Sequence, residues 1–203
     1  MNSIKLLKKL VSIPSYVDKT HDEHKIGNYI LNYLKQFKFL NVKKQKIDDK
    51  RFNVIAKTKG QPQLLLAGHI DTVQPKRGWA TNQFNATTIA SKIFGLGTVD
   101  MKAGVAAILS SIASFDNIRG LTLLFYCDEE YSFQGMKKFI SKTKKSQIGK
   151  LAIIPEPSQL KIWNAHRGVI EISFAIKGKT GHAANPASGK NAITGMNNLL
   201  NNK

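Results

Sequence analysis

The sequence is poor in cysteine, in long apolar runs and in arginine, and each shortage excludes a class of protein. Its 203 residues include one cysteine, Cys127. A disulfide framework and an all-cysteine zinc site within the chain are therefore excluded, and a reducing compartment is indicated. The longest apolar runs reach about six residues, whereas a membrane-spanning helix needs ~20, and no signal-peptide pattern is present. We expect a soluble, cytoplasmic protein without membrane contact.

Acidic residues are also scarce. The chain has 13 Asp and Glu against 31 Lys and Arg, which gives a formal net charge of +18. This balance raises the hypothesis of a polyanionic partner such as nucleic acid. However, only four basic residues are arginines, whose rigid fork suits phosphate and base contacts. The lysine-rich segment 136–150 has the pattern of an amphipathic helix and lacks interleaved stacking aromatics. Nucleic acid is therefore a disfavoured partner.

The apolar pattern predicts an α/β fold. Hydrophobic residues make up 42% of the chain and charged residues 22%, as in ordinary globular domains. Thr20 and Glu23 have the spacing of a capping box that would start the second helix. Helical spacing predicts helices over 4–11, 20–37, 101–115 and 136–150, and apolar runs predict buried strands over 52–58, 63–67, 121–127 and 151–154. We expect a mostly parallel sheet sandwiched by helices.

The pattern changes after Arg167. Ile170, Ile172, Phe174 and Ile176 alternate with polar residues, as in a half-buried strand of a second sheet. We therefore expect one domain over residues 1–167 and the beginning of another over residues 168–203.

Metal-capable side chains follow three of the predicted strands. They are His69 and Asp71, then Asp128, Glu129 and Glu130, and finally Glu156. The carboxyl ends of strands in open α/β sheets line the active crevice, so these side chains should converge. Asp100 would join them from the start of the helix that follows Gly95 and Gly97. One imidazole with several carboxylates suits zinc or a similar divalent ion.

Each of these residues also has a purely structural interpretation. A lone histidine at a strand end is more often a hydrogen-bonded structural residue, Asp100 could cap its helix, and Glu129 and Glu130 could form a solvated loop. The metal hypothesis depends on the coincidence that several of only 13 acidic residues directly follow apolar strands. A dinucleotide-binding loop is excluded, because its third glycine would fall at the position of Asp100.

Four ordered motifs, at 68–73, 95–102, 128–130 and 156–158, resemble the signatures of a di-zinc hydrolase family. This is the family of acetylornithine deacetylase, succinyl-diaminopimelate desuccinylase, aminoacylase and carboxypeptidase G2. Trp79 and Phe84 resemble the aromatic pair between its first two motifs, and 181–186 resembles the His motif of its lid domain. The resemblance implies a zinc-exopeptidase type of α/β fold with the start of an α+β lid or dimerisation domain.

The resemblance also implies roles for individual residues. The metal ligands would be His69 and Glu156 on one zinc, Glu130 on the other, and Asp100 as the bridge between two zinc ions, for which cobalt may substitute. Glu129 would be the general base, and Asp71 would fix the tautomer of His69. His182, brought by the lid of a partner subunit, would stabilise the oxyanion, so a homodimer is implied.

The sequence departs from the family pattern in two ways. Leu96, Ala103 and Tyr131 replace residues that are commonly Arg, Gly and Gly, and none of the three is a ligand. Relatives also continue through the lid and return to the catalytic domain, where a later histidine completes the second zinc site. We therefore expect this chain to be incomplete, to bind at most one zinc tightly and to have negligible amidase activity alone.

The first functional hypothesis is a metal-dependent hydrolase that cleaves the amide bond of N-acyl amino acids or small peptides. The alternative is a non-catalytic remnant or binding module that keeps the fold.

Overall fold

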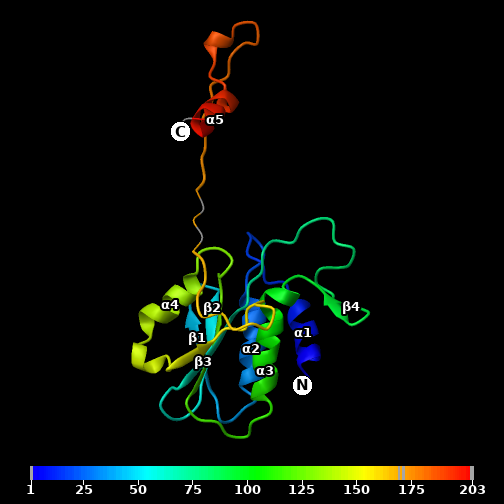
Figure 1. Cartoon of the computed structure of the whole chain (residues 1–203), viewed down its shortest axis with the longest axis vertical. Coiled ribbons are helices and arrows are strands. Elements are labelled where there is room, and N and C mark those ends of the chain that lie inside the picture. Colours follow the sequence, from blue (N-terminus) through cyan, green and yellow to red (C-terminus); the bar gives the residue numbers. More distant parts are fainter. Residues whose placement is uncertain (1, 169, 171, 202–203) are drawn as a thin grey trace. The chain divides into compact units, whose positions relative to one another are not determined.

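The computed structural model describes residues 2–168, 170 and 172–201. It forms two compact units that adjoin in sequence between Ile162 and Trp163. The first unit is a mixed β-sheet with helices on both faces (Figure 1). Within the described ranges, no helix combines the length and apolar character that a membrane crossing requires.

The central sheet of the first unit has five strands in the order β1-β2-β6-β3-β7. Their bounds are β1 (Asn41–Lys46), β2 (Phe52–Lys57), β3 (Leu64–His69), β6 (Leu121–Tyr126) and β7 (Leu151–Ile153). Strand β3 is parallel to both β6 and β7, whereas β2 is antiparallel to β1 and β6. The predicted α/β class is confirmed. The sheet is mixed rather than mostly parallel, because the unpredicted β1 and the orientation of β2 add two antiparallel pairings.

Two apolar layers cover the two faces of the sheet. Helices α1 (Ser3–Val11), α2 (His24–Leu34) and α3 (Ala103–Ile112) pack on one face, where their buried side chains form one cluster with those of β2 and β6. Helix α4 (Gln134–Lys142) covers the other face through Phe139, which packs with Leu65 and Leu124. The four predicted helices are therefore present, the last three with shorter bounds than the pattern predicted.

The predicted capping box of α2 is wrong. The helix begins at His24, and the preceding residue Glu23 makes no capping side-chain hydrogen bond; the Asp22 carboxylate accepts from the backbone N–H of His24. The Thr20 hydroxyl and backbone N–H instead donate to the carboxylate of Asp18. The Glu23 carboxylate turns into the protein, where it accepts a hydrogen bond from the backbone N–H of Asp128. Both capping partners are thus engaged elsewhere.

Two short strands and two helical turns complete the described part of the first unit. Strands β4 (Thr87–Ile89) and β5 (Lys92–Phe94) form an antiparallel hairpin. The turn η1 (Thr98–Lys102) leads into α3, and Asp100 and Met101 leave helical backbone angles inside it. The single helical turn η2 (Lys145–Gln147) separates α4 from β7.

The second unit contains the turn η3 (Pro186–Ser188) and helix α5 (Ala192–Asn201). The strand predicted over 170–176 is wrong for described residues 170 and 172–176, which have no regular structure; residue 171 lies outside the described residues. A strand needs a neighbour to pair its backbone groups. Among the described residues of this unit, the one pairing is an isolated bridge between Lys179 and Lys190.

Candidate metal centre

His69 is the residue around which the candidate site is built. It ends β3 and is buried. Its Nε2 lies 3.0 Å from Asp100 Oδ1. Its Nδ1 lies 3.2 Å from the carbonyl oxygen of Asp71 and 3.4 Å from Asp71 Oδ1. The ring is therefore held between two acidic residues from different segments, one at each nitrogen.

Asp100 reaches His69 because the chain turns sharply before it. Gly97 has φ +74°, and a Cβ at this position would lie 2.5 Å from Thr72 Cγ2, so the turn favours glycine. Helix α3 starts after Lys102, and no side chain caps it. The interpretation of Asp100 as a helix cap is therefore wrong, and its carboxylate faces His69 instead.

The acidic residues after β6 and β7 complete two groups of metal-capable side chains. One group is His69 with Asp100 and Glu156, and the other is His69 with Glu129 and Glu130; within each, the ligand atoms lie within 4.8 Å of one another. The structure thus brings together five of the predicted site residues. Asp100 and Glu130 fall in different groups. Glu129 and Glu130 are half-buried, so a fully solvated loop is the wrong interpretation.

Asp71 is buried beside this cluster. Its Oδ2 accepts a hydrogen bond from the backbone N–H of Glu130 at 2.9 Å, while its Oδ1 has no hydrogen-bond partner. Asp71 therefore contacts both His69 and the turn after β6.

Burial and neighbouring charges shift the pKa values of the carboxylates in the cluster. Burial raises the pKa of Glu156 to about 7, against the lowering effect of His69, and nearby Asp100 and Glu129 raise it further. Burial also raises the pKa of Glu129 and of Glu130. The hydrogen bond with His69 lowers the pKa of Asp100.

The pKa of His69 is raised as well. Burial on its own would lower it, but the hydrogen bond with Asp100 and the nearby carboxylate of Asp71 outweigh that effect and raise the pKa of His69 to about 10. The cluster thus holds an excess of negative charge that favours a cation. A bound metal would displace the imidazole proton, since a histidine ligand must be neutral.

These observations fit a divalent metal. The donors are one imidazole and four carboxylates, which is a nitrogen and oxygen set typical of zinc sites. The unpartnered Asp71 Oδ1 beside the far nitrogen of His69 is suited to orient that ligand.

Lys102 is buried next to this centre. Its Nζ donates to the carbonyl oxygen of Ile13 at 3.0 Å. Burial lowers the pKa of Lys102 to about 7, and the charge of Asp71 opposes that shift. Lys102 therefore ties η1 to the segment that follows α1.

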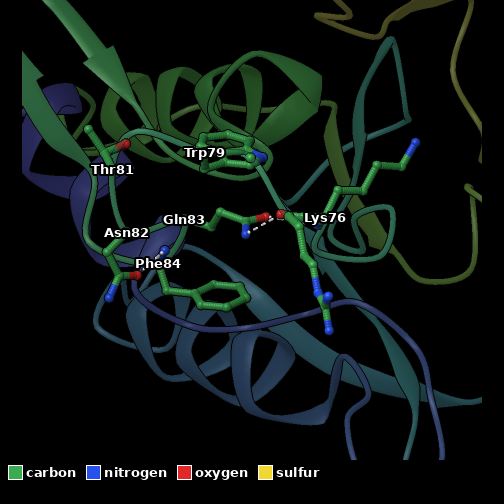
Figure 2. A pocket seen from close by; sticks show the side chains of 8 residues that line it. Lys76, Trp79, Thr81, Asn82, Gln83 and Phe84 are labelled. Atoms are coloured by element: carbon green, nitrogen blue, oxygen red, sulfur yellow. Dashed lines mark hydrogen bonds between the residues drawn. The ribbon is translucent and has the colours of Figure 1, made fainter.

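A hollow of about 410 Å³ lies in the loop 76–84 and is lined by Trp79 and Phe84 (Figure 2). Gln83 closes the loop: its amide nitrogen donates to the carbonyl of Lys76, and its amide oxygen accepts from the N–H of Lys76. None of the metal-capable residues lines this hollow.

His182 belongs to the second unit. Its Nδ1 accepts a hydrogen bond from the backbone N–H of Ala184 at 3.2 Å, and the residue is exposed. Its role stays a prediction.

Three buried charged residues behind the site were missed by sequence reasoning. Glu23 was assigned to a helix cap, and Arg51 received no role. Asp128 was predicted among the metal-capable side chains after β6, but it belongs to neither metal-capable group and pairs with Arg51 instead. They form a network with one another. The available signal was that Arg51, one of four arginines, directly precedes a buried strand.

A buried histidine surrounded by carboxylates, at the ends of parallel strands in an α/β sheet, defines a metallohydrolase type of site. Residues 65–189 match the model of peptidase family M20/M25/M40. This chain belongs to that family of metallopeptidases, and the resemblance predicted from the four motifs is confirmed.

The chain is similar to several curated acetylornithine deacetylases. It is 34% identical over 207 residues to that of Buchnera aphidicola subsp. Schizaphis graminum, covering 97% of this chain and 54% of the relative. It is 37% identical over 161 residues to that of Aliivibrio fischeri strain MJ11, covering 77% of this chain and 42% of the relative. The chain thus spans about half the length of the curated relatives it matches.

Solved structures share the fold. An M20 family metallo-carboxypeptidase from Sulfolobus solfataricus superimposes with a TM-score of 0.63 at 19% identity, covering 76% of this chain and 37% of that one. A tripeptidase from Staphylococcus aureus gives a TM-score of 0.62 at 20% identity, covering 98% of this chain and 55% of that one.

Proposed function

We propose that this chain supplies the N-terminal part of a metal-dependent amide hydrolase that acts on N-acyl amino acids or small peptides. The observation that carries the proposal is the cluster around His69, where carboxylates from three separate segments form two groups that share the imidazole, with the ligand atoms of each group within 4.8 Å of one another. The acetylornithine deacetylases that the chain resembles support an N-acyl amino acid as the substrate class.

The proposed metal is zinc, with two ions in a complete site and cobalt as a substitute. His69, Asp100 and Glu156 would hold the first ion, and Glu130, with Asp100 as a bridging ligand, would contribute to the second. When bound, zinc would polarise the scissile carbonyl and make water a better nucleophile.

Glu129 is the proposed general base. Its carboxylate is half-buried, and burial raises its pKa, which makes it a stronger proton acceptor than an exposed glutamate. It would take a proton from the attacking water and pass it to the leaving amine. Asp71 would hold the proton of His69 at Nδ1, and so leave Nε2 free to face the metal.

Residues from 168 onward, within the second unit, are proposed as the beginning of a lid or dimerisation domain. In a homodimer, His182 would stabilise the oxyanion of the partner's substrate. We further propose that the chain alone has negligible amidase activity and binds at most one zinc tightly.

A chimera tests the proposed activity. Residues 1–203 are joined to the remaining C-terminal part of the Buchnera deacetylase, and hydrolysis of N-acetylornithine and other N-acetyl amino acids is measured with zinc or cobalt. We expect metal-dependent turnover. Glu129→Gln should reduce turnover about 10²–10⁴-fold, the usual contribution of a general base.

The metal content of the variants distinguishes the proposed base, Glu129, from a proposed metal ligand, His69. Glu129→Gln should keep its bound metal, whereas His69→Ala should lose it. An inactive chimera that folds and binds no metal would support the alternative, a non-catalytic remnant. Retention of more than about a tenth of the activity in Glu129→Gln would contradict its role as the base.

A further inference from the structure

A buried network of charged side chains lies behind the turn that carries Glu129 and Glu130. The Arg51 Nη1 lies 3.1 Å from Asp128 Oδ1 and 3.8 Å from Glu23 Oε1. The side chains of Glu23, Asp128 and Arg51 are only 1%, 4% and 13% exposed. Three ionisable groups from the start of α2, the start of β2 and the end of β6 therefore meet inside the first unit.

The network holds the backbone of the turn directly. Glu23 Oε1 accepts from the backbone N–H of Asp128 at 2.9 Å, and Asp128 Oδ2 accepts from that of Gln134 at 3.2 Å. The carbonyl oxygen of Asp128 accepts from the N–H of Phe133 at 2.7 Å. Asp128 itself has φ +68°, a left-handed conformation that a non-glycine residue adopts when its surroundings enforce it.

The turn is also fixed on the metal side. The backbone N–H of Glu130 donates to Asp71 Oδ2, which places one anchor two residues after the anchor at Asp128. Glu129 lies between these two anchors. Its carboxylate direction therefore depends on two backbone hydrogen bonds to buried carboxylates, one from Glu23 and one from Asp71.

Stability alone is a poor explanation for this arrangement. Burying two carboxylates with one arginine costs desolvation that the ion pairs recover only in part, and apolar side chains in their place are often equally stable. One oxygen, Glu23 Oε2, has no hydrogen-bond partner. A fixed turn geometry is what the network provides and an apolar cluster would not.

We propose that Glu23, Arg51 and Asp128 are positioning residues that set the direction of the Glu129 and Glu130 carboxylates. The inference rests on the proposed function, because it assigns those carboxylates to the metal centre. Glu23 and Arg51 lie outside the four motifs, and none of the three residues belongs to the two metal-capable groups.

The first test is amide hydrogen exchange on the metal-free chain. Glu23→Leu keeps the approximate volume but removes the acceptor for the Asp128 N–H. Arg51→Met keeps an apolar stem but removes the ion pairs with Glu23 and Asp128, together with a third ion pair to the more exposed Asp48. We expect exchange over residues 128–130 to rise about tenfold or more in both variants, by local opening, while exchange in β3 stays near the wild-type rate. Glu23→Gln, which keeps the acceptor, should restore protection. Asp49→Asn is the control, since that side chain is fully exposed.

The second test is a Co²⁺ titration followed by visible absorption. Glu23→Leu and Arg51→Met should weaken the binding event that depends on Glu130 about tenfold, the scale of supporting residues around metal ligands. Binding through Asp100 and Glu156 should be unchanged, and Glu23→Gln should again restore the wild-type value.

The outcomes separate the two proposals. A uniform rise of exchange over the whole first unit, with unchanged Co²⁺ binding by the folded protein, would mean a merely structural role and overturn the inference. A wild-type chain that binds no Co²⁺ would overturn the proposed metal site. In that case, exchange at 128–130 still decides whether the network orders the turn.

Discussion

Strands β6 and β7 both run parallel to β3 and both lead to acidic residues of the candidate site, but they do so in opposite surroundings. Every residue of β6 is buried, and the turn after it is fixed by Glu23, Arg51 and Asp71. Every residue of β7 is exposed, and Glu156 follows it on an edge that pairs only with β3 in the described part of the sheet. Similar ligands are thus held by a rigid interior on one side and by an open sheet edge on the other.

The largest expected effect is on zinc affinity, when a carboxylate grouped with Glu156 is compared with one that supports the turn after β6. Asp100 belongs to the group with Glu156, and Asp71 supports the turn after β6. Asp100→Ala should weaken tight zinc binding more than about 100-fold, because a ligand is lost, whereas Asp71→Ala should cost about 10–100-fold as a supporting residue. Competition with a chromophoric chelator measures both. Equal, mild losses would return Asp100 to a structural role.

Truncating one apolar side chain in each strand tests the difference in burial. Leu123 in β6 is fully buried, and Ile153 in β7 is 54% exposed. Leu123→Ala should lower the free energy of unfolding by about 3 kcal/mol through lost contacts and a cavity, whereas Ile153→Ala should lower it by less than about 1 kcal/mol. Urea denaturation provides both values. A large loss in Ile153→Ala would show that β7 is covered in solution, for example by a second copy of the chain.

The contribution of buried Glu23 to the stability of the folded protein should also depend on pH. Burial raises the pKa of Glu23 to about 7 from an ordinary value of 4.5, and the charges of Asp71 and Asp128 add to this while Arg51 opposes it. The folded state then binds more protons than the unfolded state between these values, so this contribution to stability is complete below about pH 4.5 and is lost as the pH rises through 7.

Glu23→Gln isolates that contribution. The variant and the wild type should have similar stability at pH 5, and the wild type should be less stable by about 2 kcal/mol at pH 8. Denaturation curves at several pH values provide the difference. A constant difference across this range would mean that Glu23 has the same protonation in both states.

The smallest effect is expected at the contact between α3 and the segment that follows β7. A Cβ at Gly104 in α3 would lie 2.3 Å from the carbonyl oxygen of Pro155, directly before Glu156. Gly104→Ala should lower stability by about 1–2 kcal/mol, because displacement of Pro155 outweighs the helix preference of alanine. Gly27→Ala is a matched control, since its Cβ would meet side-chain atoms rather than backbone, the ring of Phe52 at 3.3 Å and Ile70 Cδ1 at 3.7 Å. Circular dichroism during denaturation compares the two.

Local patterns were sufficient to predict the positions of β3, β6 and β7 and the residues that follow them, but the prediction that β7 is buried is wrong, because all three of its residues are exposed. Strands β3 and β6 are nearly continuous apolar runs, so their ends, and with them His69 and Glu129, could be located from the sequence. Strand β1 was missed because it is an edge strand with lysines and almost no apolar side chains.

Long-range contacts could not be predicted in the same way. The hydrogen bond from Asp128 to Glu23 joins residues 105 positions apart, and the local spacing of Thr20 and Glu23 predicted a helix cap instead. The alternation over 170–176 predicted a strand, but alternation describes the two faces of a strand and does not provide the neighbour that it must pair with.

The buried amine of Lys102 has a practical consequence. It is the one lysine among the described residues that is buried, in a chain where lysines are abundant on the surface. Amine-reactive reagents reach lysines from solvent, so modification of Lys102 requires its contact with the Ile13 carbonyl to open. In a labelling time course followed by mass spectrometry, exposed lysines would be modified first. The delay before Lys102 reacts would then time the opening of the segment after α1, within the same sample.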